Sequence, residues 1–377
     1  MKAPRLASLD AFRGFAIAGM VLVNNPGSWT SVHPPLAHAA WNGCTFTDLI
    51  FPFFLFAAGL SLAISLGNRA RAGRWAAYRT LLRRAATLAL IGILMGAIPA
   101  FAWSTLRIPG VLQRIGLTLA LGAPVVLWGG WRGALAAIGA LVALWLGLQF
   151  LVPVPGADGV VAAGRLLPGC DFGSWLDRAL LGGHLWARAR TWDPEGLVGT
   201  LTATASLLFG VLAAHLLARP AAGRPRGPVL VLLGLGLLAA GLLWGRVLPL
   251  NKSLWTPSYT LATAGWSFLL LGAFQGLLDE APEGLRDRAR RICQPLSIYG
   301  LNALFMFVLS GLVARFIQTV KVDGPAGAVP LKQAMFEALA RLPLAPANAS
   351  LLFAVLFDLA LFAVAWGLWR KRWVIKV

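Results

Sequence analysis

The stretch from Leu36 to Gly59 reads LAHAAWNGCTFTDLIFPFFLFAAG, and it joins a polar cluster directly to a long apolar segment. The apolar segment continues to about Leu66, roughly twenty residues, which is long enough to cross a bilayer as a helix. His38 lies in the connection that leads into this segment, and Asp48 lies at its start. The pattern indicates chemistry at a membrane surface.

Composition extends this interpretation to the whole chain. Of the 377 residues, 58% are hydrophobic and 12% are charged, and the mean hydropathy is +0.73. A soluble domain carries about twice that share of charge. The sequence therefore predicts one all-α domain over residues 1–377, a polytopic transmembrane helix bundle of about ten spans. The spans are expected at residues 11–25, 46–66, 80–102, 110–128, 133–151, 196–218, 227–246, 255–278, 294–318 and 349–368.

Basic residues set the expected orientation, because cytoplasmic connections of membrane proteins collect Lys and Arg. The second, sixth and eighth spans are each followed by arginines, and both chain ends are basic. The residues concerned are Lys2, Arg5, Arg69, Arg71, Arg74, Arg79, Arg83, Arg84, Arg219, Arg224, Arg226, Arg286, Arg288, Arg290, Arg291, Arg370, Lys371, Arg372 and Lys376. With ten spans, both termini are expected in the cytoplasm. His38 is then extracytoplasmic.

The net charge of +19 does not indicate a nucleic-acid-binding protein, because the basic residues are spread over short connections beside the spans. We expect membrane lipid to be their partner. The first apolar run lacks a small-residue cleavage site and is expected to be a retained helix rather than a signal peptide.

The three cysteines have no metal-ligand spacing, so no metal site is expected. Cys44 and Cys170 both fall on the expected outer side, where two separate thiols are favoured over a disulfide. The glycines at Gly234, Gly236 and Gly241 lie inside a span, which favours close helix packing over nucleotide binding.

The longest interruption between spans covers residues 152–195 and is rich in tryptophan and mixed charge. This content favours a folded extracytoplasmic cap over a disordered loop. Sugars often stack on tryptophan, and the cap is one place where that contact is expected.

Ionisable groups at the ends of spans are costly and tend to be functional. Asp10 and Arg13 are three apart, which fits a local ion pair, a headgroup anchor or an anion site. Arg107 and Arg114 are seven apart on one helix face, which fits anion binding or pairing with Asp48. Asn24 fits either a helix stop or a donor to an acyl carbonyl.

Further polar groups fall in the last spans and in the connection after the seventh. Tyr299, Asn302 and Asp358 need partners inside the bundle, and Asp358 has Arg13 or another arginine as a candidate. The polar and aromatic cluster of the connection fits an interfacial aromatic belt or a binding surface. Its members are Asn251, Lys252, Trp255, Ser258 and Tyr259.

Several blocks of the chain together resemble one known family. SLDAFRG, MVLVNN and HAAWNGCTFTDLIFPFFLFAAG are similar to the heparan-α-glucosaminide N-acetyltransferase family and its bacterial relatives. RIPGVLQRIG, WDPEGLVGT and NKSLWTPSY resemble further blocks of that family in the same order.

The resemblance implies an acetyltransferase that uses cytoplasmic acetyl-CoA to acetylate the amino group of a glucosamine-type sugar across the membrane. His38 matches the active-site histidine of the family, and Asn24, Asn42 and Asp48 match its other motif positions. We expect these four residues to be catalytic. For acetyl-CoA we expect Arg13, Arg114, Tyr299 and Asn302 as contacts, and for the sugar Trp41, Asn251, Lys252 and Glu195.

Some alternatives stay open at this stage. His38 fits both a nucleophile that becomes acetylated and a base that deprotonates the sugar ammonium. A multispan transporter or exporter of a sugar or acylated metabolite is the competing class, in which the buried charges form a path. The resemblance is compatible with a homodimer, and it implies the bacterial inner membrane as the location and an amino sugar as the acceptor.

Overall fold

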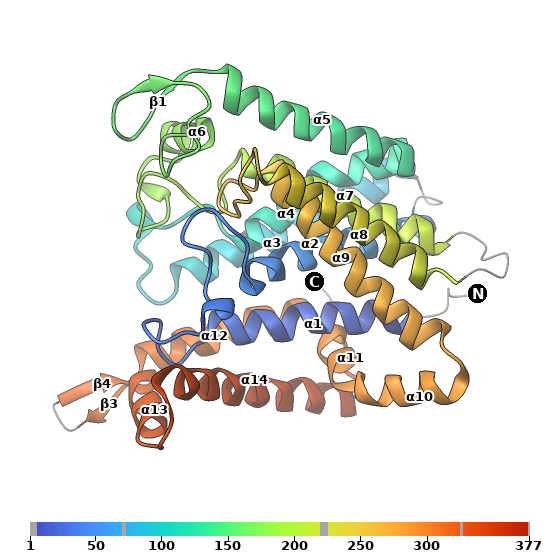
Figure 1. The fold of residues 1–377 in the computed structure, drawn as a ribbon. Coiled ribbons are helices and arrows are strands. Elements are labelled where there is room, and N and C mark those ends of the chain that lie inside the picture. Colours follow the sequence, from blue (N-terminus) through green and yellow to red (C-terminus); the bar gives the residue numbers. More distant parts are fainter. Residues whose placement is uncertain (1–5, 70–72, 219–224, 325–326, 376–377) are drawn as a thin grey trace. The chain divides into compact units, whose positions relative to one another are not determined.

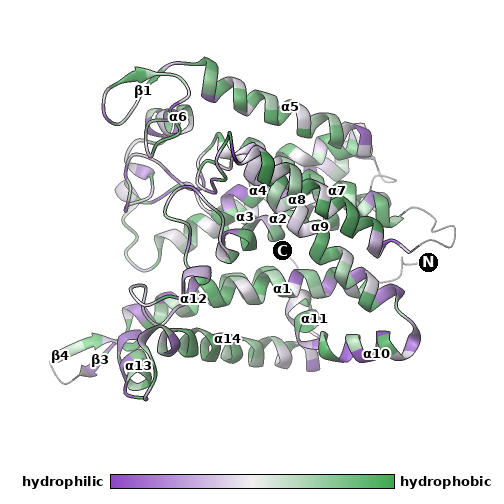
Figure 2. Cartoon of the chain, in the orientation of Figure 1, coloured by the Kyte–Doolittle hydropathy of each residue, from purple (hydrophilic) through white to green (hydrophobic). Residues whose placement is uncertain are grey.

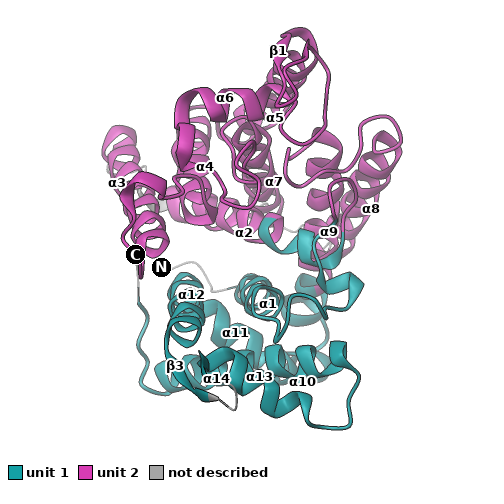
Figure 3. Ribbon diagram, turned by 90° about the vertical axis from the view of Figure 1, so that its left-hand side faces the viewer, with its two compact units in different colours: residues 1–39, 45–51, 274–376 teal, residues 40–44, 52–273, 377 magenta. Residues whose placement is uncertain are grey.

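The computed structural model describes residues 6–69, 73–218, 225–324 and 327–375. It is mostly helical, as predicted (Figure 1). Contacts divide the chain into two compact units, each described by itself (Figure 3): residues 1–39, 45–51 and 274–376 form unit 1, and residues 40–44, 52–273 and 377 form unit 2. Six of the basic residues named above, Lys2, Arg5, Arg71, Arg219, Arg224 and Lys376, lie outside the described residues.

Unit 1 contains α1 and most of the last third of the chain. Its elements are α1 (Ala7–Asn24), the first turns of α2 (Phe46–Arg69), a π-helical turn (Gly276–Glu280), α10 (Glu283–Ile292), α11 (Gln294–Leu301), α12 (Ala303–Thr319), β3 (Lys321–Gly324), β4 (Gly327–Pro330), α13 (Leu331–Ala340) and α14 (Pro346–Arg370). β3 and β4 pair antiparallel with Val322 opposite Val329, a hairpin that the sequence did not predict.

Unit 2 contains the middle of the chain. Its elements are the rest of α2, α3 (Arg74–Ala97), α4 (Val111–Pro124), a π-helical turn (Val125–Gly129), α5 (Gly130–Leu151), β1 (Val154–Pro155), β2 (Val161–Ala162), α6 (Phe172–Leu181), α7 (Gly199–Ala218), α8 (Gly227–Trp244) and α9 (Pro257–Gln275).

Eight helices in the described residues are long and apolar enough to cross a membrane, or nine if α11 and α12 count as one broken span. Figure 2 shows hydrophobic residues along most of these helices, while hydrophilic residues gather in α10 and in the connections. The prediction of a polytopic helical protein is confirmed at this coarser level.

One of the eight stretches, Val111–Leu151, covers two of the predicted spans. Its chain turns back at Gly130, which has a positive φ of 58° that glycine adopts without strain. A Cβ added at Gly133 would lie 3.3 Å from the carbonyl oxygen of Val125. In a straight helix those two residues would be about 12 Å apart. The stretch is therefore a helical hairpin made of α4 and α5.

Two predicted spans have wrong boundaries. The third was expected at residues 80–102, but α3 ends at Ala97 because Pro99 cannot continue a helix, and it begins six residues earlier. The ninth was expected as one helix over residues 294–318, but the chain bends by 83° between α11 and α12. Asn302 lies at this bend with φ −120° and ψ 36°, outside the helical region, so it interrupts the helical backbone.

Glycines bring several helices into close contact, as the predicted packing requires. In unit 1, a Cβ at Gly14 of α1 would lie 1.7 Å from the carbonyl oxygen of Leu296 in α11. In unit 2, a Cβ at Gly241 of α8 would lie 2.3 Å from the nitrogen of Ala262 in α9, and Gly234 makes a similar approach. Gly236 has no atom near its Cβ position, so only two of the three glycines expected to serve packing do so.

The segment between α5 and α7 is folded around Arg178. Its guanidinium donates to the carbonyl oxygens of Gly169 at 2.7 Å, Thr191 at 2.8 Å and Pro155 at 3.0 Å. The helix that carries Arg178, α6, begins at an Asp171 side chain that accepts a hydrogen bond from the Ser174 amide. The Arg178 bonds hold Pro155, Gly169 and Thr191 against α6.

Candidate functional site

His38 and Asp48 form a hydrogen-bonded pair within unit 1. Nδ1 of His38 lies 2.7 Å from Oδ1 of Asp48. The His38 side chain is 45% exposed, whereas the Asp48 side chain is 1% exposed. The sequence placed these two residues at one site, and the structure brings their side chains together.

Asp48 is held by the start of α2 as well as by His38. Its second oxygen, Oδ2, accepts hydrogen bonds from the amides of Ala39 and Thr45 and from the hydroxyl of Thr45, each at 3.1 Å. The Thr45 hydroxyl lies 2.7 Å from the carbonyl oxygen of Ala37. Asp48 lies in the first turn of α2, where the helix dipole favours a negative charge. The carboxylate is therefore fixed in its ionised, acceptor-only form.

This geometry decides which nitrogen of His38 is basic. An ionised carboxylate accepts and cannot donate, so Nδ1 of the neutral imidazole carries the proton. Nε2 then holds the lone pair, on a ring that is nearly half exposed. A side chain in this form can act as a general base or as a nucleophile.

The two asparagines that end α1 have different surroundings. Asn24, the predicted catalytic residue, is exposed. Asn25 is buried, and its Nδ2 donates to the carbonyl oxygen of Val21 at 2.8 Å, which closes the end of the helix. The helix-stop function that the sequence suggested for this pair is thus performed by Asn25.

A second polar cluster lies in unit 2, around Arg107. This guanidinium donates through Nε to Asp193 at 2.8 Å and also bonds Glu195. Burial opposes its charge, but the hydrogen bonds and charges of Asp193 and Glu195 outweigh burial and raise the pKa of Arg107 above its usual range. Burial likewise opposes the charge of Glu195, whose pKa is lowered because Arg107, Arg114 and Lys252 are close. Both groups are charged at neutral pH.

Arg114 lies one helical turn into α4 and touches the same segment. Its Nη2 donates to the carbonyl oxygen of Gly196 at 2.8 Å, and its guanidinium lies 5.1 Å from the centre of the Trp255 ring. The structure therefore places Arg107 and Arg114 against residues 193–196, and the acidic partners of Arg107 are Asp193 and Glu195.

Asp177 of α6 completes this cluster. Its Oδ1 accepts a hydrogen bond from the Leu197 amide at 2.9 Å. Burial raises the pKa of Asp177 to about 7, although the Leu197 bond works in the opposite direction. The sequence did not single out Asp177 as a site residue, because it gives no sign that distinguishes this aspartate from an ordinary surface carboxylate.

The predicted acceptor residues are also in unit 2, where each interacts with a residue of another connection. Nδ2 of Asn251 donates to Oδ1 of Asn42 at 3.2 Å, and the neighbouring amide of Gly43 donates to Leu250. The Trp41 ring meets Trp192 edge to face, with the ring centres 4.9 Å apart. Lys252 contributes its charge to Glu195. The WNG motif thus joins the NKSLW connection and the cap.

Of the residues expected to hold acetyl-CoA, Arg13, Tyr299 and Asn302 lie in unit 1, whereas Arg114 lies in unit 2. The hydroxyl of Tyr299 lies 2.7 Å from Oδ1 of Asp358 and 2.8 Å from its carbonyl oxygen, so Asp358 pairs with a tyrosine and not with Arg13. Asn302 bonds the chain near its end, donating to the carbonyl of Trp373 at 3.0 Å and accepting from the Ile375 amide at 2.8 Å. Arg13 lies half-buried on α1.

The cysteines and the acidic groups offer little for a metal. The structure joins none of Cys44, Cys170 and Cys293 in a disulfide bond. In the described ranges, no group of three or more His, Cys, Asp or Glu side chains is arranged to hold a metal ion.

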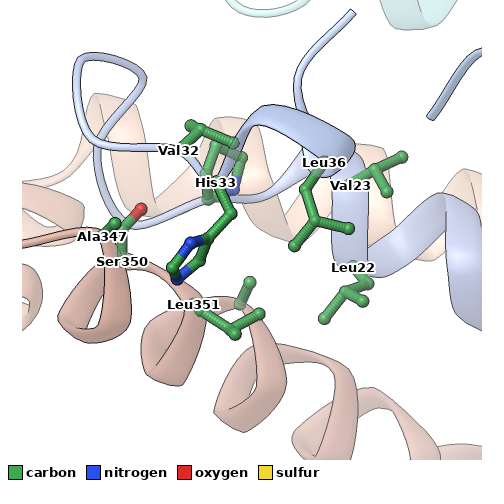
Figure 4. Close-up of a pocket in the computed structure, with 10 residues that line it drawn as sticks. Leu22, Val23, Val32, His33, Leu36, Ala347, Ser350 and Leu351 are labelled. Atoms are coloured by element: carbon green, nitrogen blue, oxygen red, sulfur yellow. The ribbon is translucent and has the colours of Figure 1, made fainter. Parts of the chain in front are cut away.

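A small pocket in unit 1 lies beside His33 (Figure 4). Leu22, Val23 and Leu36 line it together with Ser350 and Leu351 of α14. Its free volume of about 10 Å³ admits one water molecule. The pocket is too small for a sugar or a nucleotide, and His33 is anchored there by Asn348 at 2.9 Å.

Comparison with known proteins gives two kinds of match. Residues 5–155 match the family described as heparan-alpha-glucosaminide N-acetyltransferase, catalytic. The heparan-alpha-glucosaminide N-acetyltransferase of Homo sapiens is 30% identical over 364 residues, which cover 81% of this chain and 52% of the human protein. That of Mus musculus is 29% identical over 365 residues, covering 81% of this chain and 53% of the mouse protein.

The chain spans about half the length of these curated relatives. The matched residues 5–155 include SLDAFRG, the VNN motif, the His38–Asp48 pair and RIPGVLQR. The resemblance drawn from the motifs is confirmed, and the chain is a relative of the heparan-alpha-glucosaminide N-acetyltransferases.

Proposed function

We propose that this protein is a membrane-embedded N-acetyltransferase that moves an acetyl group from acetyl-CoA to the amino group of a glucosamine-type sugar. One observation carries the proposal: Asp48 fixes His38 in the tautomer whose Nε2 is basic, on a ring that is 45% exposed. Similarity to enzymes named for this reaction supports it.

In the direct route, Nε2 of His38 removes a proton from the sugar ammonium, and the amine attacks the thioester carbon. The carbon–sulfur bond breaks, and the CoA thiolate takes a proton from the imidazolium, so each turnover releases one thiol and one net proton. In the covalent route, Nε2 attacks the thioester carbon and CoA leaves as the thiolate. The sugar amine then attacks the acetyl carbon and displaces the imidazole, which gives the same amide, thiol and net proton. Asn24 and Asn42 are the proposed donors to the carbonyl oxygen.

The proposed topology has ten spans with both termini in the cytoplasm of a bacterial cell and His38 on the outer side. The hairpin at Gly130 divides the 111–151 stretch into two spans, and the bent α11–α12 pair adds one, which together raise eight candidate spans to ten. Connections assigned to the outer side also bond one another in unit 2, as Arg107 does with Asp193 and Asn251 with Asn42.

Substrate roles follow from this arrangement. We propose that the sugar contacts Trp41, Asn251, Lys252 and Glu195. All four lie in unit 2 and interact with its other connections. Arg13, Tyr299 and Asn302 are proposed to meet acetyl-CoA. We propose membrane lipid as a further partner of the basic connections. A homodimer is compatible with the family.

The test uses purified protein in detergent with acetyl-CoA and glucosamine, and measures free thiol. We expect thiol release that depends on both substrates and falls by at least about a hundredfold in His38→Ala, the usual weight of a general base. His33→Ala is the matched control, because His33 lies in the same connection but is bonded to Asn348. Equal loss in both variants, or no loss in His38→Ala, would contradict the proposal.

A second measurement separates the two routes. Incubation with radiolabelled acetyl-CoA and no sugar is expected to leave label on the protein only if the covalent route operates. If no thiol is released but the protein carries the sugar into vesicles, the results would instead favour a transporter.

A further inference from the structure

Arg114 is a fully buried cation with incomplete hydrogen bonding. It is 1% exposed, and only Nη2 has a hydrogen-bond partner, the carbonyl oxygen of Gly196. Its Nε and Nη1 have no partner among the described residues. A buried donor without a partner costs about 1–3 kcal/mol. An arginine kept in this state suits a site whose remaining partners belong to a ligand.

The surroundings hold Arg114 in place. Its guanidinium lies over the Trp255 ring, which is itself fixed: Nε1 of Trp255 donates to Ser206 at 3.1 Å, and Thr202 donates to the carbonyl oxygen of Trp255 at 2.5 Å. A Cβ at Gly199 would lie 3.0 Å from Nη2 of Arg114, so this glycine leaves room for the guanidinium. The donors are therefore positioned before any ligand arrives.

The charges around Arg114 indicate the class of ligand. Glu195, Asp193 and Asp177 face it with negative charge, and Arg107 faces it with positive charge. Counting Lys252, three basic groups thus meet three carboxyl groups. Asp177, whose pKa is about 7, is only partly ionised at neutral pH, and the oxygens of Asp193 and Glu195 already bond Arg107. A nearly balanced cluster does not favour a phosphate, which needs excess positive charge. It suits an uncharged, oxygen-rich group.

Position favours the sugar over the cofactor. Arg114 bonds the residue after Glu195 and stacks on Trp255, three residues after Lys252, so it shares two segments with the proposed sugar contacts.

We propose that Arg114 determines acceptor specificity: its Nε and Nη1 donate to hydroxyl or ring oxygens of the amino sugar, beside the carboxylate of Glu195. This rests on the proposed function and moves Arg114 from the cofactor, where the sequence placed it, to the acceptor. The competing interpretation is that Arg114 only positions residues 193–196 through Gly196.

The experiment compares Arg114→Lys with Arg165→Lys in purified protein. Lysine keeps the charge but lacks the planar set of donors. Arg165 lies in the same unit and pairs with Asp158 at 2.5 Å, so it is the matched control. Binding of N-acetylglucosamine is measured by calorimetry without acetyl-CoA. We expect Arg114→Lys to weaken it at least tenfold and Arg165→Lys to leave it unchanged.

Kinetics then distinguish recognition from positioning. For Arg114→Lys we expect a tenfold higher KM for glucosamine and an unchanged KM for acetyl-CoA. The KM for cyclohexylamine, which has no ring hydroxyls, is expected to change less than threefold. Equal losses on both amines, or a raised KM for acetyl-CoA, would overturn the assignment. If Arg114→Lys does not fold, Gly199→Ala displaces the same guanidinium and is expected to give the same selectivity.

The two proposals fail separately. Sugar binding that depends on Arg114 in a protein without acetyl transfer refutes the enzyme and keeps the specificity assignment. Acetyl transfer with sugar binding unaffected by Arg114→Lys refutes the assignment and keeps the enzyme.

Discussion

At the scale of single residues, spacing in the sequence located the reactive pair but not the charges around it. His38 and Asp48 are ten residues apart and meet because the connection folds back onto the first turn of α2. Asp358 pairs with Tyr299, 59 residues away, and Arg107 pairs with Asp193, 86 residues away. Such pairs depend on how helices pack, which a single sequence does not specify, so local motifs could be predicted and distant partners could not.

Asp177 gives a residue-scale prediction about stability and pH. An unfolded aspartate titrates near 3.9, whereas burial raises the pKa of Asp177 to about 7 in the folded protein. Between those values the folded state holds the extra proton, so its free energy of unfolding decreases as pH rises from about 4 to about 7 and is level above that. We expect Asp177→Asn to remove this slope. The melting temperature of the variant minus that of the wild type is therefore expected to increase from pH 5 to pH 8.

The control for that measurement is Asp158→Asn. Asp158 is an exposed carboxylate whose pKa is lowered, chiefly by the hydrogen bond from Arg165, so it stays ionised throughout the same pH interval. Its variant is expected to differ from wild type by a constant amount between pH 5 and pH 8. A constant difference for Asp177→Asn as well would contradict the prediction.

At the scale of elements, hydropathy located the helices and missed the places where the backbone breaks. The reversal at Gly130 agrees with the predicted gap at residues 129–132, because two adjacent glycines end the apolar run there. The bend at Asn302 was missed, since the apolar residues continue on both sides of it. The start of α3 at Arg74 was missed because charged residues in its first turns resemble a loop. Hydropathy therefore predicts where the apolar helices lie, whereas the position of each helix end depends on the residues around it.

Helix α8 gives an element-scale prediction with an internal control. Gly241 faces α9, where a Cβ would lie 2.3 Å from the nitrogen of Ala262, while Gly236 has nothing within 4 Å. We expect Gly241→Leu to force α8 from α9 and lower the melting temperature in detergent by several degrees, whereas Gly236→Leu leaves it unchanged. Thermal unfolding followed by size-exclusion chromatography measures both. A similar loss for the two variants would show that close packing is not the reason for these glycines.

At the scale of the whole molecule, the distribution of charge sets the topology that the proposed reaction needs. Arg288, Arg290 and Arg291 are exposed on α10, a helix with few apolar residues between two candidate spans. From the positive-inside rule we propose that α10 faces the cytoplasm and that the 26–45 connection faces the opposite side. A reaction that takes acetyl-CoA from the cytoplasm and acetylates a sugar outside requires this separation.

Sidedness is checked by cysteine labelling in intact cells. In a variant whose three native cysteines are replaced, exposed positions Thr30, Ala187 and Asp287 each receive one cysteine. A membrane-impermeant maleimide is expected to label Thr30→Cys and Ala187→Cys directly, and Asp287→Cys only after the cells are permeabilised. Labelling of Asp287→Cys in sealed cells would reverse the topology and place His38 in the cytoplasm.

The carboxylate of Asp48 serves two purposes at once. It anchors the opening turn of α2 through the Ala39 and Thr45 amides, and it sets the tautomer of His38. Any weakening of that turn by heat, denaturant or a neighbouring substitution therefore also misaligns the imidazole. Folding and reactivity share one anchor here, so a substitution at position 48 is expected to impair both together.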